Sequence, residues 1–265
     1  YNVNDMIDTR GPLRMAGFTI RDFRSYGPSQ SVHDVFTHSS NIGTARIAQV
    51  IGGERQRDFL AQLGLLEPTP VEIVEAANAR PLVPGRWGEL STMTISYGHG
   101  VSTSLVQLAG AYATMVNGGT RIAPTLLRQN GPQMGPRVIS EATSHSMRAL
   151  MRAVVTEGTA SFGEVEGYAV GGKTGTADLP RATGGYYDDR NLTTFASAFP
   201  MHDPRYVLIT TLQEPVETSG PEPRRTAGWT AVPVAAEIIR RSAPLLGLRP
   251  EIEPLAMDAL SSTSR

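Results

Sequence analysis

The stretch GYAVGGKTGT, residues 167–176, carries side chains that could do chemistry in two different ways. It matches the pattern G-x-x-x-x-G-K-[ST] from Gly167 through Lys173 and Thr174, and in that pattern a glycine-rich loop cradles phosphates. It also contains the run K-T-G-T from Lys173 to Thr176, which on another fold lines the site of an acyl-transfer enzyme. The first interpretation predicts an NTPase, and the second predicts a serine acyl-enzyme.

The residues that follow Lys173 separate the two interpretations. In a phosphate-binding loop a helix begins at G-K-[ST], because the helix N-terminus holds the phosphates. Here Gly175, Pro180 and the pair Gly184–Gly185 interrupt any such helix. Short β-forming residues flank the run, so we expect a strand beside a cleft. On that strand Gly175 would leave room for a substrate backbone.

K-T-G is used together with an S-x-x-K motif and a Ser-x-Asn element in penicillin-recognising enzymes. Ser39-Ser40-Asn41 supplies the second element: a serine hydroxyl can relay a proton, and an asparagine amide can bind a substrate carbonyl. The alternative is that this run only caps a helix, since Ser and Asn favour that position. S-x-x-K does not occur in the sequence, because Lys173 is the only lysine and Val170 stands three residues before it.

The elements that must position these residues follow from periodicity and turn signals. Short strands are expected at residues 13–15 and 18–20, and the Pro- and Gly-rich segment 64–101 is expected to be mostly loop. Residues 195–199 and 206–212 are expected to form an antiparallel hairpin. Helices are expected over residues 31–38, 42–51, 54–63, 103–116, 141–156 and 231–241. Helices in the middle and strands late in the chain indicate an α+β domain.

Composition excludes several classes of function. The 265 residues are 40% hydrophobic and 18% charged, as in soluble globular proteins, and the net charge of −1 gives no general attraction to nucleic acid. The absence of cysteine excludes disulfides and thiolate zinc sites, and the five histidines lack metal-ligand spacing, so we expect neither a metal nor a cofactor. No apolar run approaches the ~20 residues of a membrane span. An anchor is therefore expected only outside this chain.

The sequence resembles the transpeptidase domain of class B penicillin-binding proteins, most closely the division-specific type that makes septal peptidoglycan. Five blocks carry the resemblance: HSSNIGTARIA, SYGHGVSTSLVQLAGAYATMVNGG, MRAVVTEGTA…GYAVGGKTGTA, FASAFPMHDPRYVLITTLQEP and GWTAVPVAAEII. Asn41 favours the division type, since elongation-type relatives usually carry Asp there. The resemblance implies the serine penicillin-recognising fold, an antiparallel sheet flanked by a mainly helical cluster.

The family places its S-x-x-K motif before the region that begins here. We therefore expect residues 1–249 to be the central and C-terminal part of a transpeptidase domain, and residues 250–265 to be a C-terminal tail. The resemblance further implies a full-length protein with a single membrane anchor upstream, at the periplasmic face of the bacterial inner membrane. Its implied partners are divisome membrane proteins, and nucleic acid is not among them. The chain alone is expected to be inactive.

The resemblance also implies the chemistry. A serine attacks the penultimate D-Ala carbonyl of a peptidoglycan stem peptide, the terminal D-Ala leaves, and an amine of a neighbouring stem takes the acyl group. β-Lactam antibiotics acylate the same serine. Lys173 supplies positive charge for the substrate carboxylate, which the hydroxyls of Thr174 and Thr176 bind, while Gly175 lies along the substrate. The backbone N–H of Thr176 is one half of the oxyanion hole.

The same resemblance gives Ser39 the role of passing a proton to the leaving amine, and Asn41 that of orienting the substrate amide. Two other functions stay open from the sequence. One is a β-lactamase or D,D-carboxypeptidase of the same fold. The other is a non-catalytic scaffold or sensor module that recognises penicillin.

Overall fold

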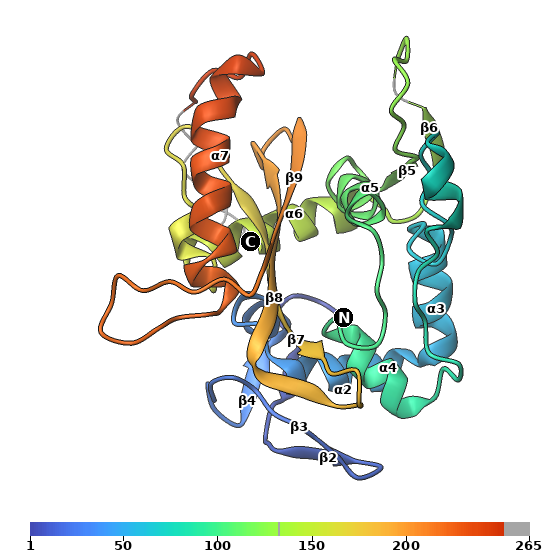
Figure 1. The fold of residues 1–265 in the computed structure, drawn as a ribbon, viewed down its shortest axis with the longest axis vertical. Helices are drawn as coiled ribbons and strands as arrows, with labels where there is room; N and C mark the ends of the chain where they lie inside the picture. The colour runs from blue at the N-terminus through green and yellow to red at the C-terminus, as the bar shows by residue number, and fades with distance from the viewer. Residues whose placement is uncertain (132, 252–265) are drawn as a thin grey trace, which may run out of the picture.

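A three-stranded antiparallel sheet lies at the centre of the computed structural model, which describes residues 1–131 and 133–251 (Figure 1). Its strands are β7 (Gly171–Pro180), β8 (Tyr186–Phe199) and β9 (Tyr206–Gln213), in the order β7-β8-β9. The predicted strand through Lys173 and the predicted hairpin are therefore confirmed. β7 is an edge strand, so one of its two backbone edges is not paired within the sheet.

Helices cover both faces of this sheet. Alternate side chains of a strand point to opposite faces, so each strand contributes residues to both contacts. α7 (Ala231–Leu245) packs on the face that carries Phe195, which is fully buried. α5 (Leu105–Val116) and α6 (Glu141–Thr156) bury Ala198 on the other face. Burying one large apolar side chain stabilises the fold by ~1.5–3 kcal/mol, so these two layers hold the sheet in place.

A second group of elements includes a smaller core of Ile20, Ile42, Ala45 and Met93, and most of this group lies in the lower part of Figure 1. Its helices are α1 (Val32–Thr37), α2 (Asn41–Ile51), α3 (Gly53–Gln62) and α4 (Glu89–Ser96). Its strands are β1 (Met6–Asp8) paired with β4 (Ser29–Ser31), and β2 (Leu13–Met15) paired with β3 (Phe18–Ile20). β2 and β3 occupy the two predicted strand ranges.

Serine caps set the starts of four helices, and each cap typically contributes ~1 kcal/mol. The side chains of Ser31, Ser40 and Ser140 accept the N–H of the residue three positions later, and Ser104 forms a full capping box with Gln107. The predicted helices in these regions are confirmed to within two residues. α7 continues to Leu245, four residues beyond the predicted end.

Residues 64–101 are mostly loop, as predicted, apart from two helical stretches. They contain a 3₁₀ helix, η1 (Val74–Asn78), and α4. α4 has weak local signals: its N-cap, Gly88, makes no side-chain hydrogen bond, and β-branched Thr92 and Ile95 lower its helix propensity. Packing against α2 stabilises it instead, with Met93 fully buried.

A further hairpin, β5 (Thr120–Ile122) with β6 (Met134–Arg137), was not expected from the sequence and extends away from the body (Figure 1). Two more 3₁₀ turns, η2 (Ser161–Gly163) and η3 (Ala227–Trp229), precede α7. The predicted tail lies outside the described residues from position 252 on. Among the described residues, no helix combines the length and the apolar character needed to cross a membrane.

Candidate active site

The ammonium nitrogen of Lys173 donates a hydrogen bond to the hydroxyl of Ser39, with Nζ 2.7 Å from Oγ. The two residues are 134 positions apart in the chain, and the fold joins them because α1 packs against α6, which leads into β7. Lys173 Nζ also lies 3.3 Å from the carbonyl oxygen of Thr174. The structure thus brings the Ser39-Ser40-Asn41 run and the K-T-G-T strand together through Ser39 and Lys173.

Ser39 occupies an unusual backbone position between α1 and α2. Its φ is +60°, in the left-handed region that residues other than glycine rarely adopt. The tight turn is held by two backbone hydrogen bonds, from Ser39 N–H to Phe36 O and from Ser40 N–H to Val35 O. Strained residues of this kind persist where the surrounding structure holds them. Here the strain directs the Ser39 side chain at Lys173.

The environment of Lys173 lowers its pKa from 10.5 to about 8, because burial disfavours the charged ammonium. The Phe36 ring lies beneath the charge, with Nζ 5.9 Å from the ring centroid, and such a contact offsets part of this cost. A lysine with a pKa near 8 can hold a positive charge at neutral pH and can also exchange a proton there. Lys173 thus suits a site that binds an anion and moves protons.

The hydroxyl groups of Thr174 and Thr176 on β7 each make one hydrogen bond within the protein. Thr174 Oγ1 and Thr159 Oγ1 lie 2.6 Å apart, so one of their two hydroxyl protons joins them and the other stays available. Thr176 Oγ1 accepts the backbone N–H of Ala227 at 3.0 Å, which leaves its own proton free to donate. These two hydroxyls are candidate donors to a carboxylate.

The glycines of β7 serve two different purposes. A Cβ at Gly172 would lie 2.4 Å from the carbonyl oxygen of Ala196, and one at Gly171 would lie 2.6 Å from Met201, so both are glycine because of packing. At Gly175 a Cβ would meet no atom within 4 Å. Gly175 faces open space on the same side of the strand as Lys173, where a ligand backbone could come close.

The middle residue of the S-x-N run is the helix cap. Ser40 Oγ accepts the N–H of Gly43 at 2.9 Å and donates to Asp22 Oδ2 at 2.8 Å, and Ser40 is buried. Asn41 Nδ2 donates to the carbonyl of Arg21 at 3.0 Å. The structure therefore brings Ser39 together with the K-T-G-T strand, whereas the amide of Asn41 is bound to the segment before α1.

A contact between aromatic rings links the β7–β8 hairpin to the loop after α4. Tyr186 Oη lies 3.1 Å from His99 Nε2, and the two ring centroids are 5.1 Å apart. The link ties the end of the hairpin to the helical part that carries Ser39.

Within the described residues, no group of three or more His, Asp or Glu side chains is arranged to hold a metal ion.

Comparison with known proteins gives the family. The family profile described as "Penicillin binding protein transpeptidase domain" matches residues 4–240. The chain belongs to the penicillin-binding protein transpeptidase family. The family resemblance carried by the five sequence blocks is thereby confirmed, and the K-T-G-T interpretation prevails over the phosphate-loop interpretation.

Individual relatives agree with this membership. "Probable peptidoglycan D,D-transpeptidase FtsI" of Caulobacter vibrioides is 37% identical over 257 residues, which cover 93% of this chain and 43% of the relative. Among solved structures, the apo transpeptidase domain of Burkholderia pseudomallei penicillin-binding protein 3 has a TM-score of 0.84 and 32% identity, covering 95% of this chain and 75% of that one. The α+β fold expected from the sequence is that of these transpeptidase domains.

A third relative is solved with an antibiotic. Penicillin-binding protein 3 of Mycobacterium tuberculosis, complexed with aztreonam, has a TM-score of 0.78 and 29% identity, covering 96% of this chain and 60% of that one. The chain spans 43% and 39% of the length of two of the curated relatives it matches.

Sequence reasoning missed two residues of this candidate site. Thr159, which pairs with Thr174, lies in the turn after α6, within the block VVTEGTA that supports the family resemblance. Asp22, which binds the Ser40 hydroxyl and the N–H of Ile42 at 2.9 Å, stands in an irregular segment with no sequence signal. A search for hydroxyl residues in turns next to the family blocks could have found Thr159. Asp22 required the fold.

Proposed function

We propose that the protein is a serine-type peptidoglycan D,D-transpeptidase, and that β-lactams are recognised at the same site. One observation carries the proposal: the Lys173 ammonium meets the Ser39 hydroxyl at 2.7 Å beside the unpaired edge of β7. An extended peptide can lie along such an edge and pair with its backbone. The names of the relatives, peptidoglycan D,D-transpeptidase among them, support the same activity.

In this proposal, the strand β7 binds the C-terminal carboxylate of the D-Ala-D-Ala stem. Lys173 attracts the negative charge. The Thr176 hydroxyl donates to a carboxylate oxygen, and so does the Thr174 hydroxyl when Thr159 donates the bond between the two threonines. Gly175 leaves space for the stem backbone. The backbone N–H of Thr176 is one donor to the oxyanion that forms on the attacked carbonyl. Loss of such a donor typically costs ~2.7–4 kcal/mol of transition-state stabilisation.

Ser39 is the proposed proton relay. Its oxygen accepts from Lys173 and keeps its own proton free to donate, so it can pass a proton to the leaving amine and regain one from the lysine. Asn41 is proposed to turn its amide from the Arg21 carbonyl toward the substrate amide when substrate arrives. The attacking serine and its lysine belong to an S-x-x-K motif expected upstream of Tyr1.

The cellular setting forms part of the proposal. The relatives include an FtsI protein and the "Stage V sporulation protein D" of Bacillus subtilis, and Asn41 is the residue expected in the division type. We therefore assign the activity to septal cell-wall synthesis at the periplasmic face of the inner membrane. The full-length protein would be anchored upstream and would work with divisome membrane proteins. Residues 1–249 would form the part of the transpeptidase domain that this chain supplies.

The test is a set of reactions of the full-length protein with a D-Ala-D-Ala stem peptide, an amine acceptor and benzylpenicillin. A transpeptidase forms cross-linked peptide and a slowly hydrolysed penicilloyl adduct. Release of D-Ala without cross-linking would indicate a carboxypeptidase, and rapid hydrolysis of penicillin a β-lactamase. A stable adduct without any peptide turnover would indicate a sensor. Each of these three outcomes would contradict the proposed activity.

A second experiment tests the 265-residue chain by itself. We predict no adduct with penicillin, because its only lysine belongs to the substrate-binding strand and no second lysine is present to activate a serine. Mass spectrometry after incubation with benzylpenicillin measures this. A one-to-one adduct would mean that a serine of this chain, such as Ser39, is the nucleophile.

A further inference from the structure

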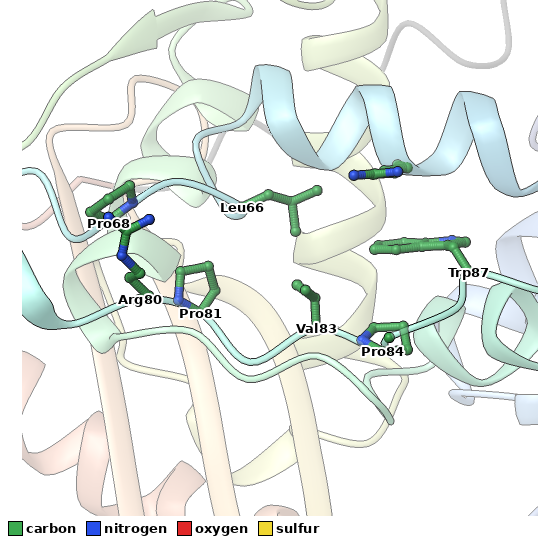
Figure 2. A pocket seen from close by; sticks show the side chains of 9 residues that line it. Leu66, Pro68, Arg80, Pro81, Val83, Pro84 and Trp87 are labelled. Atoms are coloured by element: carbon green, nitrogen blue, oxygen red, sulfur yellow. The ribbon is translucent and has the colours of Figure 1, made fainter.

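A cavity of about 320 Å³ lies between α3 and two proline-containing segments (Figure 2), and neither Ser39 nor Lys173 lines it. Figure 2 shows Arg80 at one end, Trp87 at the other, and the apolar side chains of Leu66 and Val83 between them. Its volume is at the lower end of the range for ligand pockets, enough for a few residues of a bound chain. The cavity therefore combines positive charge, an aromatic ring and apolar walls.

Trp87 is fixed in a way that leaves its ring face for a ligand. The indole N–H donates to Gln56 Oε1 at 3.1 Å, and Gln56 Nε2 donates to the carbonyl of Thr92 at 2.9 Å. Gly53 lies so close that a Cβ there would stand 3.1 Å from the indole. The polar edge of the ring is thus satisfied by the protein. A partner can gain only by stacking on the face, as apolar and aromatic side chains do.

The cationic side chains of the cavity have no partner among residues 1–131 and 133–251. Arg57 on α3 and Arg80 are both exposed, and neither guanidinium group makes a hydrogen bond or an ion pair with these residues. Nearby Glu67 cannot neutralise them, because it pairs with Arg121 at 2.5 Å. Two guanidinium groups that line one cavity and lack internal carboxylates are suited to an acidic ligand, since arginine binds carboxylates in a bidentate manner.

We propose that this cavity binds an acidic segment of another protein, with one carboxylate on Arg57, a second on Arg80, and an apolar side chain of the segment on the face of Trp87. Charge complementarity favours this occupant over a neutral peptide. The apolar walls favour it over a small inorganic anion, which would leave Leu66 and Val83 exposed; Val83 is 47% exposed in the free protein.

The position of the cavity makes this a docking site separate from catalysis. Ser40 caps the first turn of α2, and α3 begins directly after the opposite end of α2, at Gly53. An α-helix rises 1.5 Å per residue, so the eleven residues of α2 separate the two ends by ~16 Å. A partner at Arg57 would contact α3, beyond that end of α2, and not the Ser39–Lys173 pair. The inference thus goes beyond the proposed activity.

The test uses tryptophan fluorescence of the full-length protein. The sequence described here contains two tryptophans, so Trp229→Phe leaves Trp87 as its only reporter. The probes are acetyl-Glu-Pro-Leu-Glu-amide and its neutral counterpart acetyl-Gln-Pro-Leu-Gln-amide. We expect a saturable change with the acidic probe and at least tenfold weaker binding of the neutral one. Arg57→Gln and Arg80→Gln should each weaken binding about tenfold, equal to ~1.4 kcal/mol.

Arg55→Gln is the matched control, because Arg55 is an exposed arginine on α3 that does not line the cavity. It should bind like the parent, and circular dichroism should show all variants folded. Equal binding of both probes, no saturation of the acidic probe at millimolar concentration, or no effect of either arginine substitution would overturn the proposal. Tighter binding of inorganic phosphate or of a disaccharide-pentapeptide would also overturn it, in favour of a small-anion or peptidoglycan site.

Discussion

Thr174 on the K-T-G-T strand and Thr159 in the turn after α6 share a hydrogen bond between their hydroxyls, 2.6 Å apart. The pair orients the Thr174 hydroxyl before any ligand is present. Such preorganisation matters because a donor that is already aimed at the ligand does not have to be reorganised during reaction. In the proposed function, Thr159 is thus a positioning residue for the Thr174 hydroxyl.

The first prediction concerns this pair. Thr159→Val keeps the shape of the side chain and removes the hydroxyl, so the Thr174 hydroxyl loses its partner at a cost of ~1 kcal/mol. We expect penicillin acylation of the full-length protein to slow about fivefold to tenfold, with a rise in the apparent dissociation constant. Stopped-flow or fluorescent-penicillin kinetics measure this.

Thr156→Val is the control for the same substitution. Thr156 is exposed in the last turn of α6 and its hydroxyl bonds only to the carbonyl of Arg152 among the described residues. Its acylation should match that of the parent protein. Equal slowing in both variants would mean that the Thr159 contact has no specific effect on the site.

The second prediction separates the glycines of β7. Gly172→Ala would drive a Cβ to 2.4 Å from the Ala196 carbonyl, and backbone cannot yield cheaply, so we expect destabilisation of ~2–4 kcal/mol. Gly175→Ala meets no protein atom and should change the free energy of unfolding by less than ~1 kcal/mol, yet it should slow acylation. Urea unfolding and penicillin labelling are the two measurements. Normal labelling of Gly175→Ala would exclude a ligand backbone at this position.

The third prediction follows from the pKa of Lys173, lowered to about 8 in the folded protein from its ordinary value of 10.5. Between these two pH values the unfolded chain binds more protons than the folded one, so the free energy of unfolding rises with pH. Below pH 8 both states are protonated and this contribution is constant. Lys173→Met removes the titration.

The difference in unfolding free energy between wild type and Lys173→Met should therefore change from pH 7.5 to 10.5. Over this range the free energy of unfolding of the wild type should rise, relative to that of the variant, by at most about 3 kcal/mol, which is the free energy that corresponds to this shift in the Lys173 pKa. Other titrating groups are present in both proteins and cancel in the difference. Unfolding in urea at a series of pH values provides the data, and parallel curves would show that Lys173 has an ordinary pKa.

Part of this site could be predicted from the sequence, because helix-breaking and helix-capping residues act on the chain next to them. Gly175 and Pro180 exclude a helix after Lys173, so the strand β7 follows from the chain itself. Serine caps mark the starts of α1, α2 and α6 for the same reason. α4 could not be predicted, since Gly88 offers no cap side chain and packing of Met93 against α2 decides the helix.

The roles of neighbouring residues in the S-x-N run also required the fold. Ser39 and Ser40 are identical in type, and either could have capped α2. The structure gives the cap to Ser40 through Gly43 and Asp22, and it gives Ser39 a φ of +60° that turns its hydroxyl to Lys173. The hydrogen bond between Ser39 and Lys173 joins residues 134 positions apart. It depends on how α1 packs on α6, which no local sequence pattern encodes.

The central claim is that Lys173, acting with Ser39 at the edge of β7, forms a penicillin-recognising active site. Intact-protein mass spectrometry of the full-length protein during incubation with benzylpenicillin tests it most directly. We predict a one-to-one adduct for the wild type, and acylation at least ~100-fold slower for Lys173→Ala, the scale of losing a transition-state donor. Arg55→Ala, an exposed cation on α3, should label at the wild-type rate. Labelling of Lys173→Ala at that same rate would contradict the account.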